Sequence, residues 1–129
     1  MGLHIANTVI KLMSKKGTSI NQAKILILGI TFKENCPDIR NSRVVDVIQE
    51  LASFGTTIEV FDPHANASEV HHEYGFNLIG SPGKNYDAII LAVSHDEFRN
   101  LNWDKLKHEK TIVYDVKGFL DKSLITARL

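Results

Sequence analysis

The chain has one cysteine, no net charge and no long apolar run. The single thiol, Cys36, excludes an internal disulfide framework and fits the reducing cytoplasm. Lys and Arg number fifteen, as do Asp and Glu, so the charge balance gives no support to binding of nucleic acid or a membrane surface. No apolar stretch approaches the roughly 20 residues of a membrane-spanning helix, and the first residues lack a signal-peptide pattern. We therefore expect a soluble cytoplasmic domain.

Apolar residues recur with two periods along the chain. Short apolar and β-branched runs predict strands, and spacings of three and four residues predict amphipathic helices. The predicted strands are 23–30, 56–61, 76–79, 87–94 and 111–116. The predicted helices are 3–16, 42–55, 66–74 and the later part of 96–109, with a tail that is mostly loop. This alternation predicts a small doubly wound α/β domain, a five-stranded parallel sheet with an added amino-terminal helix.

A ligand of such a sheet binds beyond the carboxyl ends of the strands, where the strand order reverses. With the first and fourth predicted strands adjacent, this place lies between the loops that begin at Gly29 and Ser94, bordered by residues 115–118. The first loop lacks the G-x-G-x-x-G pattern that binds a dinucleotide, since no second glycine follows before Gly55. Asp62 ends the second strand before a proline, which favours a turn role. The fold is therefore Rossmann-like without its own NAD-binding loop.

The loop after the first strand carries charge instead of glycine. Lys33 and Arg40 flank Asp38 just before a predicted helix, whose free N–H groups favour an anion. Lysine and arginine both bind phosphate, arginine through two oxygens at once. Asn41 or Ser42 is a natural N-cap for that helix. The alternative is a solvated loop with an Asp38–Arg40 contact, and local sequence does not separate the two.

These residues fall into an ordered set of motifs. The run G-I-T-F-K-E-N-C-P-D-I-R-N-S, residues 29–42, resembles the pattern G-x-x-F-K-x-x-x-x-D-x-R-x-S. That pattern opens the carboxyl-terminal, UDP-binding domain of the UDP-glucose, UDP-N-acetylhexosamine and GDP-mannose dehydrogenases. I-E-V-F-D-P at 58–63, A-V-S-H-D-E-F at 92–98 and Y-D-V-K-G at 114–118 are similar to later family motifs in the same order.

The resemblance implies an enzyme that oxidises the C6 alcohol of a UDP-sugar to a carboxylate with NAD, in polysaccharide biosynthesis. The variant N-C-P-D-I-R-N-S resembles members acting on UDP-N-acetylhexosamines more than UDP-glucose enzymes. Residues 18–129 would form the UDP-sugar-binding domain, and residues 1–17 the end of the helix that connects it to a central domain. The catalytic cysteine motif and most of the NAD site would belong to the absent amino-terminal and central domains. We expect this chain alone to be inactive, and the whole protein to be a homodimer or larger.

The resemblance also implies roles for single residues. Lys33 and Lys117 would contact the UDP-sugar, although Lys117 also fits a surface lysine at a strand end. Arg40 would reach NAD across the interdomain cleft. Asp38 and Ser42 would shape the loop, Asp38 by pairing with a cation and Ser42 by capping the following helix.

Other reactive side chains have weaker claims. Cys36 lies outside any glycine-rich cysteine motif, so we interpret it as a loop residue rather than a nucleophile. His64, His71 and His72 lack the convergent spacing of metal ligands, so no metal site is expected. His95 follows the fourth strand at the predicted binding edge, where a functional role and a capping or packing role both remain open.

Two other functions stay open on sequence alone. A free-standing nucleotide-binding or regulatory module of the same fold would bind UDP tightly by itself, whereas we expect weak or no binding by a part of an enzyme. A purely structural interaction domain would bind no nucleotide, and fold-level likeness does not exclude it.

Overall fold

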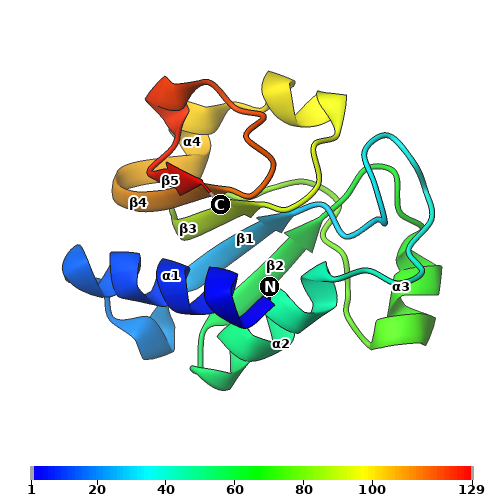
Figure 1. The fold of residues 1–129 in the computed structure, drawn as a ribbon, viewed down its shortest axis with the longest axis horizontal. Helices are drawn as coiled ribbons and strands as arrows, with labels where there is room; N and C mark the ends of the chain where they lie inside the picture. The colour runs from blue at the N-terminus through cyan, green and yellow to red at the C-terminus, as the bar shows by residue number, and fades with distance from the viewer. Residues whose placement is uncertain (1, 129) are drawn as a thin grey trace.

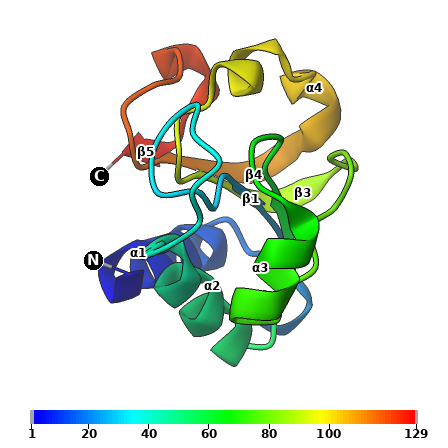
Figure 2. The same cartoon turned by 90° about the vertical axis from the view of Figure 1, so that its right-hand side faces the viewer.

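A parallel sheet runs through the middle of the molecule in the computed structural model, which describes residues 2–128 (Figure 1). Its strands are β1 (Lys24–Leu28), β2 (Thr57–Phe61), β3 (Tyr86–Leu91), β4 (Lys107–Asp115) and β5 (Ala127–Arg128), in the order β2-β1-β3-β4-β5. The α-helices are α1 (Gly2–Lys15), α2 (Val44–Ser53), α3 (Ala67–Tyr74) and α4 (Trp103–Leu106), and the 3-10 helices are η1 (Ile20–Gln22), η2 (Asp96–Asn100) and η3 (Lys122–Leu124). Figure 2 shows α1, α2 and α3 on one side of the sheet and α4 on the other, which confirms the doubly wound α/β class.

Strand β1 shows why the central strands are apolar throughout. Ile25 and Ile27 belong to the core under α1 and α2, whereas Leu26 and Leu28 belong to the core on the opposite face. All four side chains are fully buried, and each contributes about 1.5–3 kcal/mol of hydrophobic free energy. A strand covered on both faces cannot alternate with polar residues, because either face would then bury an unpaired polar group.

Helix α1 packs an apolar stripe against the same core as α2. Ile5, Val9 and Met13 are buried and recur at helical spacing, as predicted, while Leu12 is half-buried. The helix ends before Gly17, whose φ of 81° lies in the left-handed region. No helix in the described part of the chain is long and apolar enough to cross a membrane.

One predicted strand is wrong, and a different segment completes the sheet. Residues 76–79 form no strand, and Leu78 makes a single parallel bridge to Val60. Phe76 and Leu78 pack on the core without a continuous backbone ladder, which explains the apolar pattern. The fifth strand is instead Ala127–Arg128, in the tail that was predicted to be mostly loop. It is positioned by Thr126, whose N–H donates to the Val113 carbonyl at 2.7 Å, a long-range contact that local sequence does not encode.

The helix predicted in the later part of 96–109 is shorter than expected. Helix α4 has four residues, and its cap is Asn102, whose side-chain oxygen accepts from the Lys105 N–H at 3.3 Å. Strand β4 then begins at Lys107, four residues before the predicted start. The indole of Trp103 donates to the Phe98 carbonyl at 3.1 Å, so α4 is fixed to the preceding 3-10 helix η2 rather than extended.

Candidate functional site

The strand order reverses between β1 and β3, the first and fourth of the predicted strands. β1 pairs with both β2 and β3, all parallel, so their carboxyl ends lie at one edge of the sheet. The long loop that joins β1 to α2 rises from this edge (Figure 1). Ligands of open α/β sheets bind at such an edge, and we looked there for the site.

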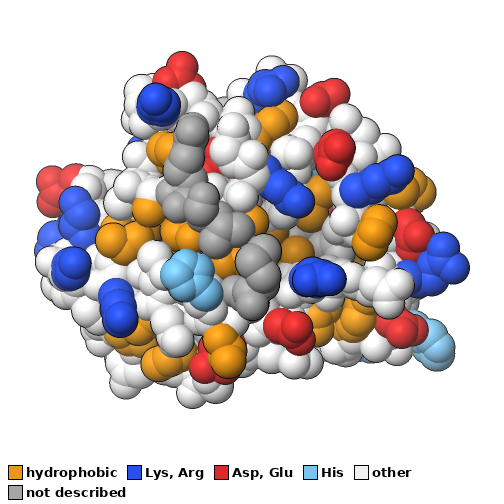
Figure 3. All heavy atoms as spheres, viewed as in Figure 1, with side chains coloured by type: hydrophobic (Ala, Val, Ile, Leu, Met, Phe, Trp, Pro, Cys, Tyr) orange, Lys and Arg blue, Asp and Glu red, His pale blue; other side chains and the backbone are white. Residues whose placement is uncertain are grey.

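A pocket of about 260 Å³ opens at this edge between α1, α2 and the ends of β3 and β4. Its apolar lining comes from Ile5, Phe32, Val44, Val47, Ile90, Ala92, Val93 and Val116. Its polar lining comes from Asn41, Arg43 and Lys117, two cations and one amide. Figure 3 shows hydrophobic surface interspersed with Lys and Arg side chains across the middle of this face. The pocket therefore combines an apolar floor with positive charge.

Lys117 is placed in the pocket by a buried carboxylate. Asp115 ends β4 with no exposed surface, and its oxygens accept from the N–H groups of Lys117 at 3.0 Å and Leu120 at 2.7 Å. These bonds turn the chain sharply after the strand, with Gly118 at a φ of 65°. Sequence reasoning placed residues 115–118 at the edge of the site and gave Lys117 a role, but gave none to the Asp115 side chain.

Lys33 and Arg40 lie on the loop after β1 but not in the pocket lining that the described residues form. Both side chains are exposed. Arg40 is already paired with Asp38, through Nη2 to Oδ2 at 2.9 Å and Nε to Oδ1 at 3.0 Å. These hydrogen bonds from Arg40 lower the pKa of Asp38 to about 2. The structure thus separates Lys117, in the pocket, from the loop cations above it.

Ser42 does not cap the following helix, which corrects the expected role. Helix α2 has Arg43 at its N-cap, with helical angles of φ −78° and ψ −15°, and no side-chain cap bond. A capping side chain needs an extended backbone at the cap residue. The Ser42 hydroxyl is buried and has no hydrogen-bond partner among the described residues. Sequence reasoning missed Arg43, although a basic residue at a helix start beside the binding edge was a usable signal.

His95 and Asp62 form a buried pair just after the ends of β3 and β2. Both side chains are fully buried, and His95 Nε2 lies 3.0 Å from Asp62 Oδ2. The other oxygen of Asp62 accepts from the N–H groups of His64 at 2.8 Å and Ala65 at 3.2 Å, so the expected turn role is present. Burial raises the pKa of Asp62, but hydrogen bonds from His95 and from backbone N–H groups outweigh it and leave the pKa below its usual value. The partnership with His95 was not predicted.

The site does not fit NAD or a metal by itself. Gly29 has a φ of 97°, and a Cβ there would lie 2.5 Å from Val93 Cβ, so this glycine serves close packing of β1 on β3 rather than a pyrophosphate. The chain then runs through a long loop, residues 29–43, before α2 begins at Val44, instead of turning directly into a helix. Among the described residues no group of three His, Cys, Asp or Glu side chains could hold a metal ion. Cys36 is a free, half-buried thiol on this loop.

Comparisons with known proteins agree with this geometry. Residues 26–122 match the UDP binding domain of the UDP-glucose/GDP-mannose dehydrogenase family. UDP-N-acetyl-D-glucosamine 6-dehydrogenases from Pseudomonas aeruginosa and Salmonella typhi are 42% and 40% identical to the chain and match 100% of it, over 32% and 31% of their own lengths. The solved UDP-D-ManNAc dehydrogenase of Pyrococcus horikoshii shares the fold, with a TM-score of 0.75 at 19% identity over 97% of this chain and 29% of that one. The chain spans about a third of the length of its curated relatives, and it belongs to the UDP-glucose/GDP-mannose dehydrogenase family as its UDP-binding domain.

Proposed function

We propose that this chain is the carboxyl-terminal, UDP-sugar-binding part of an NAD-dependent nucleotide-sugar 6-dehydrogenase. The observation that carries the proposal is the pocket at the sheet edge, which joins an apolar floor to Arg43 and Lys117. Neither cation forms an ion pair within residues 2–128, so both can neutralise an incoming anion. A nucleoside diphosphate offers the matching parts, a flat base for the floor and two phosphates for the cations.

The start of α2 also favours a diphosphate in this pocket. Its first N–H groups and its dipole favour negative charge, and Arg43 adds a formal charge at that point. Lys117 approaches from the end of β4, on the other side of the pocket. We place the diphosphate between these two elements, with the base against the apolar lining.

In this proposal the loop after β1 serves the sugar and the cofactor. Lys33 contacts the UDP-sugar beyond the pocket, and Arg40 reaches NAD held by another part of the protein. Because the chain lacks a dinucleotide loop, its own contribution is to bind and orient the substrate, and the oxidation proceeds on other domains. Residues 1–17 connect to those domains and residues 18–129 form the binding unit, in a cytoplasmic homodimer or larger assembly.

The preferred sugar in this proposal is a UDP-N-acetylhexosamine, as in the names of the relatives that match the whole chain. Steady-state kinetics of the protein that contains this chain would test it with UDP-N-acetylglucosamine, UDP-N-acetylgalactosamine and UDP-glucose. A higher kcat/KM for UDP-glucose than for either acetylated sugar would contradict this part of the proposal.

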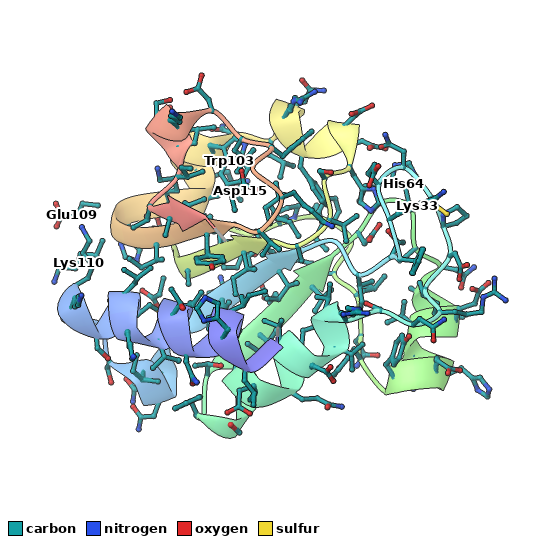
Figure 4. All side chains as sticks on the ribbon, in the orientation of Figure 1. Lys33, His64, Trp103, Glu109, Lys110 and Asp115 are labelled. Atoms are coloured by element: carbon teal, nitrogen blue, oxygen red, sulfur yellow. The ribbon has the colours of Figure 1, made fainter. Side chains whose placement is uncertain are left out.

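Binding of UDP to the protein that contains this chain tests the site. Calorimetry should show a loss of affinity of about tenfold in Lys117→Ala and in Arg43→Ala, because each substitution removes one charge-assisted contact. Lys110→Ala is the matched control, since Lys110 lies near the amino end of β4, the strand that precedes Lys117, away from the carboxyl edge (Figure 4). Absent UDP binding, or an equal effect in the control, would contradict the site. NAD reduction by the isolated chain would contradict the division of labour between domains.

A further inference from the structure

The carboxylate of Asp62 is the centre of a hydrogen-bonding network that reaches the loop after β1. Besides its two turn bonds, Asp62 Oδ2 accepts from the N–H groups of Ile30 at 2.7 Å and Thr31 at 3.1 Å. With His95, five donors converge on one fully buried carboxylate. A buried carboxylate persists only when its oxygens are satisfied in this way. Asp62 therefore fixes the point where the chain leaves β1.

The protonation state of His95 follows from its neighbours. Its Nδ1 lies 2.8 Å from the N–H of Asn35, which can only donate, so Nδ1 is the acceptor. The ring proton is then on Nε2, which donates to Asp62 Oδ2 at 3.0 Å and lies 3.1 Å from Thr31 Oγ1. The Thr31 hydroxyl gives its own proton to the Lys33 carbonyl at 3.0 Å, so its oxygen is free to accept. His95 is thus a neutral imidazole with one defined tautomer.

The same bonds hold both ends of a short arch that carries Lys33. Thr31 is bound to Asp62 at the start of the arch, and Asn35 is bound to His95 at its end. The Asn35 side chain also exchanges two hydrogen bonds with Asp96, from Nδ2 to a carboxylate oxygen at 3.3 Å and from the Asp96 N–H to Oδ1 at 3.1 Å. Between these anchors the exposed Lys33 side chain is free to reach a ligand, while its backbone is fixed.

We propose that His95 and Asp62 are positioning residues for substrate binding: the pair holds the Lys33 arch, residues 31–35, at the carboxyl edge of the sheet. Neither side chain touches the substrate, because both are fully buried. The role of the arch in binding rests on the function proposed above, whereas its anchoring by the pair does not. In the view of Figure 4, Lys33 and His64 lie at the same end of the molecule, opposite Lys110.

The surroundings of His95 make it rigid. Its ring lies 4.4 Å from the His64 ring and 5.3 Å from the Phe98 ring, measured between centroids, and is tilted to both. His64 in turn binds Glu97 Oε1 at 2.9 Å. The His95 ring contacts two aromatic neighbours and both of its nitrogens are hydrogen-bonded. It therefore loses little further conformational entropy when it bonds to the loop.

Two substitutions of His95 separate its two bonds. His95→Asn places a short amide near the position of Nδ1 and keeps an acceptor for Asn35, whereas His95→Gln places an amide near Nε2 and keeps a donor for Asp62. We expect the Asn35 amide to exchange with solvent at least about tenfold faster in His95→Gln, because its acceptor is gone. In His95→Asn we expect the Thr31 and Ile30 amides to be affected more than Asn35. His108→Gln is the control, because His108 belongs to a second His–Asp pair at the opposite edge. This substitution should leave the exchange rates of the Asn35, Thr31 and Ile30 amides unchanged.

Nitrogen-15 spectra of the wild-type chain test the tautomer directly. We expect one His95 ring nitrogen with the signature of a bare acceptor, Nδ1, and one with that of a protonated donor, Nε2. A protonated Nδ1 at neutral pH, or unchanged amide exchange in both His95 variants, would overturn the inference.

A double-mutant cycle with Lys33→Ala tests whether the pair acts through the arch. We expect His95→Gln and Lys33→Ala each to weaken UDP-sugar binding by about tenfold, and the double variant to be little weaker than either alone. Thr31→Val is a milder second variant, since it removes only the hydroxyl that bridges His95 and the Lys33 carbonyl, and a smaller coupled loss is expected. Fully additive losses would overturn the positioning role. Absent UDP-sugar binding by the protein that contains this chain would overturn the proposed function but leave the exchange test of the anchoring intact.

Discussion

A hydrogen-bonded histidine–aspartate pair occurs at each edge of the sheet, and the two pairs differ in burial. At the carboxyl edge His95 donates to Asp62 and accepts from Asn35, which is 60 residues away in sequence. At the amino edge His108 Nε2 lies 2.8 Å from Asp87 Oδ1, and His108 Nδ1 accepts from an N–H only two residues away. The first pair is fully buried, while the side chains of the second are 29% and 24% exposed. Asp87 also accepts from the Lys24 N–H at 2.9 Å, so both pairs join separate segments of the chain, but only the fully buried pair holds a loop at the carboxyl edge.

The largest expected difference between the two edges comes from neutralising the carboxylates. Asp62→Asn replaces an acceptor of five hydrogen bonds by an amide whose NH₂ faces other donors, so we expect a loss of about 3–5 kcal/mol in the free energy of unfolding. Asp87→Asn, at the partly exposed pair, should lose about 1 kcal/mol. Urea denaturation of both variants measures the comparison, and equal losses would break it.

The loss of stability at acid pH also depends on the buried Asp62. Because the folded-state pKa of Asp62 is lowered, its stabilising effect is complete above the unfolded-state pKa of about 4 and is lost as the pH falls through the lower folded-state value. Asp62→Asn should therefore show a shallower loss of stability below pH ~4 than the wild type. The slope does not vanish, because Asp38, Glu97 and Asp121 also have lowered pKa values. An unchanged slope in thermal unfolding against pH would contradict the assignment.

Glycines at the two edges give the next comparison. Gly29→Ala forces a Cβ to 2.5 Å from Val93 Cβ at a φ of 97°, and we expect a loss of about 3 kcal/mol or more. At Gly83 a Cβ would meet the Tyr86 hydroxyl at 3.3 Å, a contact that a small shift relieves, so Gly83→Ala should lose less than about 1 kcal/mol. Thermal unfolding compares the two variants, and a similar melting temperature would show that β1 and β3 do not need the close approach at Gly29.

A small effect is expected from a single hydroxyl group at the amino edge. The Tyr86 hydroxyl donates to Glu59 Oε1 at 2.6 Å and accepts from the Gly83 N–H at 2.7 Å, so Tyr86→Phe should lose about 1 kcal/mol. Burial and the bond to Glu59 raise the pKa of Tyr86 to about 12, and its stabilisation is therefore lost as the pH rises from about 10 towards that value. Tyr86→Phe should reduce this alkaline loss without abolishing it, since burial also raises the pKa of Tyr114. UDP binding should not change.

Elements defined by their own residues could be predicted from sequence, and elements defined by a distant partner could not. Continuous apolar runs predict the buried strands β1 and β3. Because these strands are adjacent, their carboxyl ends mark the edge at which the pocket opens. Residues 76–79 are also mostly apolar but make only one bridge to a neighbouring strand, whereas β5 is a strand because β4 lies beside it. An apolar strand pattern shows that a segment is buried, but a buried segment need not pair with a neighbouring strand.

The candidate site divides in the same way. Lys117 follows a strand end and was placed correctly at the sheet edge, while the pocket partner Arg43 was overlooked because the helix was expected to begin at a serine cap. The contact between His95 and Asp62 joins residues 33 positions apart, and single-sequence periodicity carries no signal for it. The sequence identified individual candidate side chains, but the hydrogen bonds that hold them became visible only in the structure.

The ion pair between Asp38 and Arg40 has a consequence for the free domain. Asp38 engages Nε and Nη2, which form one side of the guanidinium fork, so the opposite side can meet a second anion without expelling the first. Asp38 therefore acts as a counter-ion for Arg40 within the loop. The Arg40 guanidinium can bind an anion on a neighbouring domain, and its charge is balanced when no neighbour is bound.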